Sequence, residues 1–229
     1  MQIIVIPARI GSTRLPRKPL LEIHGKPTIQ HVYEAAAQTG LPVLVATDSQ
    51  EIQDTVSGFG GQAILTEAGL RSGTDRVFAA IQAFDPYEQY TEIVNLQGDM
   101  PFVKPVHIWD VLRPLQTYQM GTVVYPMQRE EQLNRNSVKA IVTWDGLLGK
   151  CHWFTRAPVG YGYHHAGIYS FKRHTLARIS NMLASQHETV EQLEQLRAVE
   201  NNIAIGCFLT EPVPMEINTA EDLQKANSI

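Results

Sequence analysis

The sequence predicts an α/β protein with a mostly parallel central sheet, helices on both faces and a small antiparallel extension. Strand and helix signals alternate through the first half of the chain, which is typical of β-α-β units and a parallel sheet. Several β-type runs follow one another more closely in the second half, and Asp145-Gly146 between two of them is a hairpin signal. We therefore expect an α/β core that carries an antiparallel part.

The first half gives clear element boundaries. Pro27 lies early in one predicted helix and Gly40 follows its end, as the usual start and stop signals do. Asp48-Ser49 is a candidate cap for the next helix, and Ser72 or Thr74 for the third. Together the patterns predict strands at residues 2–7, 43–47, 62–66 and 92–96, and helices at residues 27–38, from 48 or 49 to about 58, and from 72 or 74 to about 84.

The second half is less regular. Its apolar runs predict strands, and its periodic segments predict helices. The strands are expected at residues 122–126, 138–143, 148–154, 163–171 and 203–209, and the helices at residues 172–184, 188–200 and 219–226. At 229 residues the chain fits a single domain, residues 1–229, with the antiparallel extension within about residues 120–172.

Composition excludes several functional classes. A hydrophobic content of 44% and a net charge of −4 fit a globular protein and argue against nucleic acid as a partner, which usually calls for a basic footprint. No apolar stretch reaches the roughly 18 residues of a membrane span, and Arg9 follows too short an apolar run for a signal peptide. Cys151 and Cys207 are expected as reduced, buried thiols. We therefore expect a cytoplasmic protein with no membrane partner.

A cationic loop, residues 7–19, follows the first predicted strand. Its prolines restrict the backbone, Gly11-Ser12-Thr13 offers backbone amides, and no carboxylate is present. The loop matches neither the dinucleotide-binding glycine fingerprint nor the P-loop. A solvated basic loop is the alternative, but the place at a strand end favours an anionic ligand, most naturally a phosphate. The four cations are Arg9, Arg14, Arg17 and Lys18.

Two further segments carry polar groups at element ends. Residues 71–76 include Ser72-Gly73-Thr74, which is either a helix cap or a surface that hydrogen-bonds the edge of a flat heterocycle. Residues 95–99 end in Asp99 after a glycine, at the carboxyl end of a strand. Asp99 is either a turn residue or a ligand of a divalent cation that also contacts phosphates. A phosphate-binding loop nearby favours the metal.

Two more segments lie in the second half. His164-His165 precedes Gly167 at the start of a strand, where a structural histidine and a functional one are both open. Glu188, Glu191 and Glu194 recur at a spacing of three, so a helix over residues 188–200 would place them along one face. Such a face is usually solvated.

Taken together, these segments resemble the 3-deoxy-D-manno-octulosonate cytidylyltransferase (CMP-KDO synthetase) family. The resemblance extends over almost the whole chain, and the series of motifs is specific although each one alone is common. The matching residues are Ile6-Pro7-Ala8-Arg9, Ser12-Thr13-Arg14-Leu15-Pro16, Lys18-Pro19-Leu20, Ala46-Thr47-Asp48, Ser72-Gly73-Thr74-Asp75-Arg76, Val94-Asn95, Gln97-Gly98-Asp99, Thr155-Arg156-Ala157, His165, Gly167-Ile168-Tyr169, Leu193-Glu194-Gln195-Leu196-Arg197, Asn218-Thr219 and Glu221-Asp222-Leu223.

The resemblance implies a Rossmann-like nucleotide-diphospho-sugar transferase fold, a homodimer with the antiparallel extension at the dimer contact, and Mg²⁺ as cofactor. It implies that CTP and an eight-carbon 2-keto sugar acid give the CMP-sugar and pyrophosphate, for lipopolysaccharide synthesis. The anomeric hydroxyl of the sugar attacks the α-phosphorus, so catalysis is mostly positioning and electrostatics.

The resemblance also assigns site residues. The implied catalytic residues are Arg9, Lys18 and Asp99. CTP is assigned to Ala8, Arg9, Ser12, Arg14, Lys18, Ser72, Gly73, Thr74 and Arg76, with Arg9, Arg14 and Lys18 on the triphosphate. The sugar acid is assigned to Gln97, Arg156, His165, Glu194 and Gln195, with Arg156 on its carboxylate. Mg²⁺ is assigned to Asp99 and Asn218.

The chain departs from the family pattern at Asn218, where the family usually has the second metal-binding aspartate. Three outcomes are open: Glu216 compensates, the enzyme works with weaker metal binding, or activity is lost. Arg17 replaces a frequent glycine, and the segment 157–163 is short compared with many relatives.

Alternative functions follow from these departures. One is a cytidylyltransferase for a related sugar acid, such as the 8-amino analogue. Another is a weakly active CTP-binding paralogue with a regulatory role. The spore-coat-type nucleotidyltransferases share a Gly-Ser-Thr-Arg-Leu-Pro loop, but the segments His165–Tyr169 and Glu194–Arg197 do not support them.

Overall fold

The computed structural model describes residues 1–11 and 14–229, and the predicted CTP ligand Ser12 lies outside them. The chain forms two compact units. The first consists of residues 1–108 and 213–229, and the second of residues 109–212. The chain passes from one to the other within helix α4 (Pro105–Leu112). The prediction of a single domain with a dimer contact in its extension stays a prediction.

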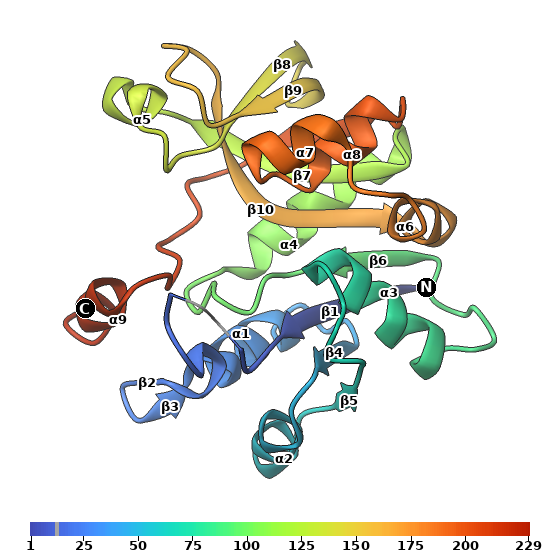
Figure 1. Ribbon diagram of the computed structural model, residues 1–229, viewed down its shortest axis with the longest axis vertical. Coiled ribbons are helices and arrows are strands. Elements are labelled where there is room, and N and C mark those ends of the chain that lie inside the picture. The colour runs from blue at the N-terminus through green and yellow to red at the C-terminus, as the bar shows by residue number, and fades with distance from the viewer. Residues whose placement is uncertain (12–13) are drawn as a thin grey trace. The chain divides into compact units, whose positions relative to one another are not determined.

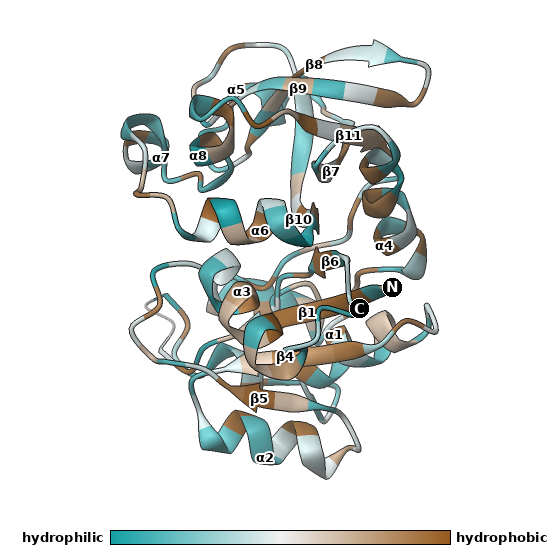
Figure 2. Cartoon of the chain, turned by 90° about the vertical axis from the view of Figure 1, so that its right-hand side faces the viewer, coloured by the Kyte–Doolittle hydropathy of each residue, from teal (hydrophilic) through white to brown (hydrophobic). Residues whose placement is uncertain are grey.

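The first unit is built on four parallel strands in the order β5-β4-β1-β6. The two central strands are continuous apolar runs whose side chains are mostly buried, as expected for a parallel sheet with both faces covered. Figure 2 shows β1 and β4 as hydrophobic segments. The strands are β1 (Gln2–Ala8), β4 (Val43–Thr47), β5 (Ala63–Leu65) and β6 (Glu92–Asn95).

Helices surround this sheet, and their starts follow capping rules. Ser72 caps α3 by accepting a hydrogen bond from the backbone N–H of Asp75, so Ser72 rather than Thr74 is the cap. Thr219 caps α9 with a reciprocal bond from Asp222. Figure 1 shows these elements. They are η1 (Lys18–Leu20), the hairpin β2 (Glu22–Ile23) and β3 (Lys26–Pro27), α1 (Thr28–Ala37), α2 (Gln50–Gly58), α3 (Gly73–Phe84) and α9 (Ala220–Ala226).

The second unit contains five strands whose pairing closes on itself. Their order is β10-β7-β11-β9-β8, and the start of β8 also pairs with the start of β10. Only β7 and β11 run parallel, so the antiparallel part is more extensive than the sequence indicated. The strands are β7 (Met120–Pro126), β8 (Lys139–Asp145), β9 (Leu148–Thr155), β10 (Tyr163–Lys172) and β11 (Ile205–Leu209).

The remaining elements of the second unit include one wrong prediction. The helix expected over residues 188–200 is two helices, α7 and α8, because Gln192 adopts a left-handed conformation with φ of 54° between them (Figure 1). The glutamates therefore do not share one solvated face. The sequence also did not indicate η2 or α5. The elements are η2 (Arg113–Gln116), α5 (Arg129–Leu133), α6 (Arg173–Ser180), α7 (Gln186–Glu191) and α8 (Gln195–Glu200).

The predicted α/β fold class is confirmed by the alternating elements and the parallel core of the first unit. The Asp145-Gly146 turn is also confirmed: Gly146 adopts a φ of +61° between β8 and β9, a backbone conformation that suits glycine. Across residues 1–11 and 14–229, no helix combines the length and apolar composition that crossing a membrane requires.

Candidate functional site

Lys18 and Asp99 meet beside the carboxyl ends of the neighbouring strands β1 and β6. Lys18 begins η1 at the end of the cationic loop, and its Nζ donates a hydrogen bond to Oδ2 of Asp99 at 2.8 Å. The two side chains are 16% and 22% exposed, so the pair is partly shielded from water. Parallel strands place ligands at this edge of a sheet. The structure thus brings the predicted phosphate-binding lysine and the predicted metal-binding aspartate together.

Asn218 joins this pair from the C-terminal segment of the chain. The backbone N–H of Ile217 donates to the carbonyl of Asp99 at 2.9 Å, which fixes the segment beside β6. Oδ1 of Asn218 accepts hydrogen bonds from Arg14 at 3.1 Å and from Lys18 at 3.4 Å. Two cations therefore point at the oxygen that the sequence assigned to a metal.

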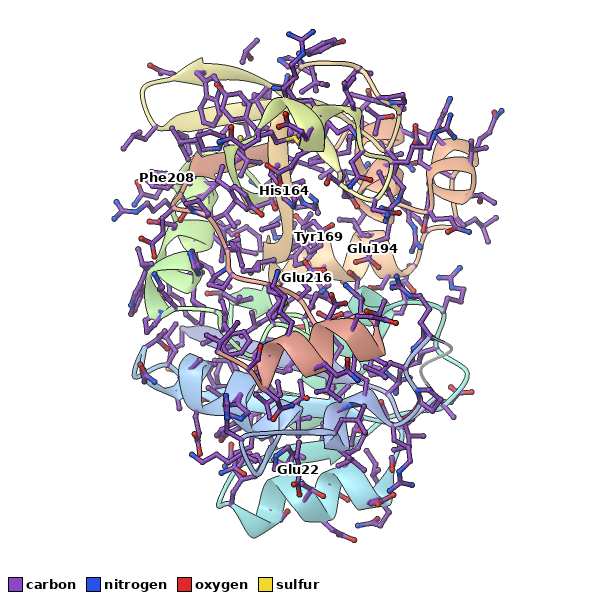
Figure 3. The ribbon with its side chains drawn as sticks, turned by 90° about the vertical axis from the view of Figure 1, so that its left-hand side faces the viewer. Glu22, His164, Tyr169, Glu194, Phe208 and Glu216 are labelled. Atoms are coloured by element: carbon purple, nitrogen blue, oxygen red, sulfur yellow. The ribbon has the colours of Figure 1, made fainter. Side chains whose placement is uncertain are left out.

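The amide nitrogen of Asn218 faces a second carboxylate. Its Nδ2 donates to Oε2 of Glu216 at 3.1 Å, and Figure 3 shows Glu216 on the segment before α9. Although Glu216 keeps solvent exposure, loss of hydration and then the Asp99 carboxylate raise the pKa of its carboxyl to about 7. Arg14 and Lys18 oppose this rise. Glu216 thus belongs to the same electrostatic cluster as Asp99.

The donor set of this cluster fits a hard divalent cation. It consists of two carboxylates and one amide oxygen, which are the ligand types that Mg²⁺ prefers. In the part of the chain that the structure describes, no group of three or more His, Cys, Asp or Glu side chains is arranged to hold a metal ion. A cation here would therefore share oxygens from another molecule, as Mg²⁺ does when it bridges a carboxylate and a phosphate.

The start of α3 packs against the end of β1 and the segment after β6. A Cβ on Gly73 would meet Cγ of Pro7 and Oε1 of Gln97 at 3.4 Å, which is ordinary van der Waals contact, so Gly73 lies directly beside both residues. Thr74 accepts a hydrogen bond from Asn95 at 3.2 Å, and Asn95 in turn accepts one from Gln97 at 3.0 Å. Ala8 is buried at the end of β1.

This arrangement has two consequences for the sequence predictions. The predicted base-binding residues Ser72, Gly73 and Thr74 lie on one helix start. Gln97, which was assigned to the sugar acid, belongs to the first unit and lies beside Gly73, whereas the other four residues assigned to that ligand belong to the second unit.

Arg76, another predicted CTP ligand, is enclosed by protein groups. It is 3% exposed, and its guanidinium donates to Thr66 Oγ1 at 2.6 Å and to Asp48 Oδ2 at 3.3 Å. Burial lowers the pKa of Arg76, and the Asp48 carboxylate opposes this effect. Arg9 is exposed at the end of β1, and its charge also acts on Arg76. Arg76 therefore braces the loops behind the site.

His165 lies in the second unit on β10 and is buried there. The hydroxyl of Thr122 donates to the carbonyl of Ile168 at 2.8 Å, so its oxygen accepts from Nε2 of His165 at 3.0 Å. Burial, followed by the charges of His164 and Arg156, lowers the pKa of His165 to about 3. The imidazole is therefore neutral at physiological pH, and Nδ1 is its acceptor.

Gln195 begins α8 and is 3% exposed. Its Oε1 accepts a hydrogen bond from the hydroxyl of Tyr169 at 3.0 Å. Its Nε2 has no hydrogen-bond partner among the described residues. A buried amide donor of this kind calls for an acceptor from a ligand or water. Figure 3 shows Tyr169 on β10 and Glu194, the residue before Gln195.

Arg156 follows the end of β9 and is held by backbone carbonyls. Its Nε donates to Glu191 O at 3.2 Å and its Nη1 to Asn136 O at 3.1 Å. Its own backbone N–H donates to Oε2 of Glu191 at 2.9 Å. Arg156 was expected from the sequence, but this role of Glu191 was not, because a continuous helix over residues 188–200 would have placed Glu191 on a solvated face.

The parallel core, the cationic loop and the oxygen donors at the strand ends define an α/β nucleotidyltransferase. Residues 3–205 match the sequence profile of the cytidylyltransferase family. The chain therefore belongs to the cytidylyltransferase family. This result confirms the family prediction made from the motifs.

Individual relatives agree with this assignment. The chain is 42% identical to a 3-deoxy-manno-octulosonate cytidylyltransferase of Paramagnetospirillum magneticum, over 99% of this chain and 96% of the relative. It is 41% identical to the protein of the same name from Rhodospirillum rubrum, over 99% and 94%. A solved structure of CMP:2-keto-3-deoxy-manno-octonic acid synthetase complexed with CTP has a TM-score of 0.91 at 35% identity, covering 99% of this chain and 97% of that one.

Proposed function

We propose that this protein transfers CMP from CTP to 3-deoxy-D-manno-octulosonate and releases pyrophosphate. The observation that carries the proposal is the hydrogen-bonded cluster at the strand ends of the first unit, in which Lys18 donates to both Asp99 and Asn218 and Arg14 donates to Asn218. Full-length relatives of this name, at about 40% identity, support the same reaction. The solved relative complexed with CTP supports the nucleotide.

The residues of the first unit act on the nucleotide. Arg14 and Lys18 bind the triphosphate together with Arg9, and the family resemblance assigns Ser12 to the same ligand. The α3 start formed by Ser72, Gly73 and Thr74 lines the cytosine and ribose with Ala8. The cations offset the negative charge that grows on the phosphoryl oxygens and on pyrophosphate as it leaves. Arg76 supports this surface through Asp48.

Mg²⁺ is the proposed cofactor. Asp99 and Asn218 would hold it, with Glu216 as a further carboxylate. When bound, the ion neutralises phosphate charge and lowers the pKa of the hydroxyl that attacks the α-phosphorus. Lys18 donates to Asp99 in the protein alone, so it must give up this contact or share the carboxylate when the ion binds.

The residues of the second unit act on the sugar acid. Arg156 suits its carboxylate because a guanidinium binds carboxylates in a bidentate manner. Neutral His165 offers an acceptor for a sugar hydroxyl, and Nε2 of Gln195 offers the donor that the protein leaves unpaired among its described residues. Glu194 at the start of α8 completes the proposed set, with Gln97 from the first unit.

The test is a pyrophosphate-release assay with purified protein and Mg²⁺. CTP should be preferred over ATP, GTP and UTP, and 3-deoxy-D-manno-octulosonate over its 8-amino analogue and over other 2-keto sugar acids. If the protein prefers the 8-amino analogue, the proposed sugar acid is wrong but the proposed reaction, transfer of CMP from CTP, still holds. CTP binding without turnover with any sugar acid would favour the regulatory paralogue and contradict the proposal.

The proposal extends to the pathway, the cellular compartment and the oligomeric state of the protein. CMP-activated 3-deoxy-D-manno-octulosonate supplies lipopolysaccharide synthesis, and CTP as co-substrate places the reaction in the cytoplasm. We expect a homodimer, as the family resemblance implies. Light scattering coupled to size-exclusion chromatography checks this, with a mass of twice 25.6 kDa as the expected result.

A further inference from the structure

Lys139 is a buried lysine at the point where the sheet of the second unit closes. It is the first residue of β8 and its exposure is 0%. In the strand register it lies opposite Thr155 of β9 on one side and His164 of β10 on the other. A lysine is rarely buried completely, because its charge then loses hydration. This position therefore calls for an explanation.

The Lys139 ammonium is satisfied by backbone carbonyls. Its Nζ donates to Asn134 O at 2.6 Å, to Ser137 O at 2.8 Å and to Arg156 O at 3.1 Å. These bonds use every proton that an ammonium group has. Burial lowers the pKa of Lys139, and the nearby Arg156 charge adds to this effect. Lys139 is neither exposed nor free to donate to a ligand, so it acts only on the protein around it.

Glu191 contacts Arg156, whose carbonyl is one of the acceptors of Lys139. Its carboxylate accepts from the hydroxyl of Thr155 at 2.7 Å and from the backbone N–H of Arg156 at 2.9 Å. Lys139 thus takes the carbonyl of Arg156 and Glu191 takes its N–H. The backbone of Arg156 is fixed at both polar groups by two opposite charges.

The side chain of Arg156 is held by backbone carbonyls of Asn136 and Glu191. Nη1 donates to Asn136 O, in the segment whose carbonyls at 134 and 137 bind Lys139. Nε donates to the backbone carbonyl of Glu191. Within the described residues, Nη2 is left without a hydrogen-bond partner. These two contacts fix the plane of the guanidinium and leave Nη2 and the second proton of Nη1 to face a carboxylate.

We infer that Lys139 and Glu191 are positioning residues that together orient Arg156 for the carboxylate of the sugar acid. The inference rests on the proposed function, in which Arg156 binds that carboxylate. Neither residue contacts substrate in this account. A guanidinium that is held in place before binding loses no conformational entropy when the substrate arrives. A displacement of a substrate-positioning group by about 1 Å can lower the rate roughly a hundredfold.

The experiment measures steady-state kinetics of Lys139→Met and Glu191→Gln against both substrates. Each variant should raise the KM for 3-deoxy-D-manno-octulosonate by about 10- to 100-fold, while the KM for CTP changes less than about twofold. Lys150→Met is the matched control, because Lys150 is an exposed lysine on β9 of the same sheet. It should behave like the parent protein. Circular dichroism and thermal unfolding check that each variant folds.

Arg156→Ala separates the inference from the proposed function. Arg156→Ala should raise the KM for the sugar acid, and adding Lys139→Met or Glu191→Gln to it should raise this KM no further. If Arg156→Ala leaves the KM unchanged, the role of Arg156 in the proposed function is wrong. If Arg156→Ala raises the KM but both positioning variants leave it unchanged, the inference is overturned. Glu191→Gln keeps the size of the side chain, so it carries the test if Lys139→Met does not fold.

Discussion

The Lys18 ammonium donates to the Asp99 carboxylate at 2.8 Å, across 81 positions of the sequence. The contact joins the loop after β1 to the segment after β6. A lysine thereby occupies the carboxylate that a divalent cation would use in the complex with nucleotide. The charge of Asp99 is compensated in the protein alone, and in the proposed function Lys18 would become available to a phosphate if a metal ion took its place.

Replacing Lys18 by alanine should weaken CTP binding and leave the fold intact. A charge-assisted hydrogen bond contributes about 1.5–3 kcal/mol, which corresponds to a loss of roughly 10- to 100-fold in affinity. Isothermal titration calorimetry with CTP and Mg²⁺ measures the change. Lys26→Ala is the control, because Lys26 forms an exposed ion pair with Glu34 in the same unit. Unchanged CTP affinity in Lys18→Ala would contradict the phosphate assignment.

The metal site should respond in opposite directions to two substitutions. Glu216→Gln removes a carboxylate and should raise several-fold the Mg²⁺ concentration that gives half-maximal pyrophosphate release. Asn218→Asp adds a carboxylate and should lower that concentration, because hard cations bind carboxylates more strongly than amides.

Binding of Mn²⁺ in the presence of CTP, followed by electron paramagnetic resonance, gives a readout of the same site that does not depend on turnover. Glu221→Gln, on the exposed first turn of α9, is the control. Identical metal curves for the parent protein and Asn218→Asp would remove Asn218 from the metal site.

Stability should fall at acid pH in part because of His165. Its pKa of about 3 in the folded protein lies below the ordinary value near 6.5, so the unfolded chain binds the proton more readily. The contribution of His165 to the free energy of unfolding is fully present above pH 6.5. It is lost as the pH falls toward about 3, at about 1.4 kcal/mol per pH unit. Urea unfolding should therefore show about 2 kcal/mol of this loss between pH 6.5 and 5, and His165→Asn should lack that part. Equal pH slopes in the two proteins would show that His165 is not the buried neutral group described.

Breaking the Arg76–Asp48 pair should destabilise the protein strongly. The two side chains are 4% and 10% exposed, so Arg76→Met leaves a carboxylate that is buried without its cation. We expect a loss of about 3–5 kcal/mol in the free energy of unfolding. Lys26→Ala, which breaks an exposed pair, should cost about 1 kcal/mol or less. Urea unfolding compares the two, and equal losses would mean that Arg76 does not act as a brace.

The parts of the fold that followed from sequence are those with local signals. β1 and β4 are continuous apolar runs, and Ser72 carries its own capping hydrogen bond. The break at Gln192 was not predictable in this way, because a left-handed glutamine has no distinctive pattern. Helix α5 was missed because it is only five residues long and buries none of them, so it shows no apolar periodicity.

The candidate site likewise contains residues that had a signal in the sequence and residues that had none. Lys18 and Asp99 were identified because their motifs mark a loop and a strand end, and Asn218 because it stands where the family it resembles has an aspartate. Lys139 was placed in a strand, but nothing local indicated that it is buried, since its acceptors belong to residues 134, 137 and 156. The contact from Lys139 to the carbonyl of Arg156, 17 residues away, is visible only in three dimensions.

The first unit is interrupted in the sequence by the whole of the second. Residues 216–218 reach Asp99, Arg14 and Lys18 only after residues 109–212 have been synthesised. A growing chain thus contains all five strands of the second unit before it contains residues 216–218, which complete the cluster around Lys18. Any cleavage near residue 213 would leave those strands covalently joined, yet would detach the amide and carboxylate that complete the metal-binding cluster.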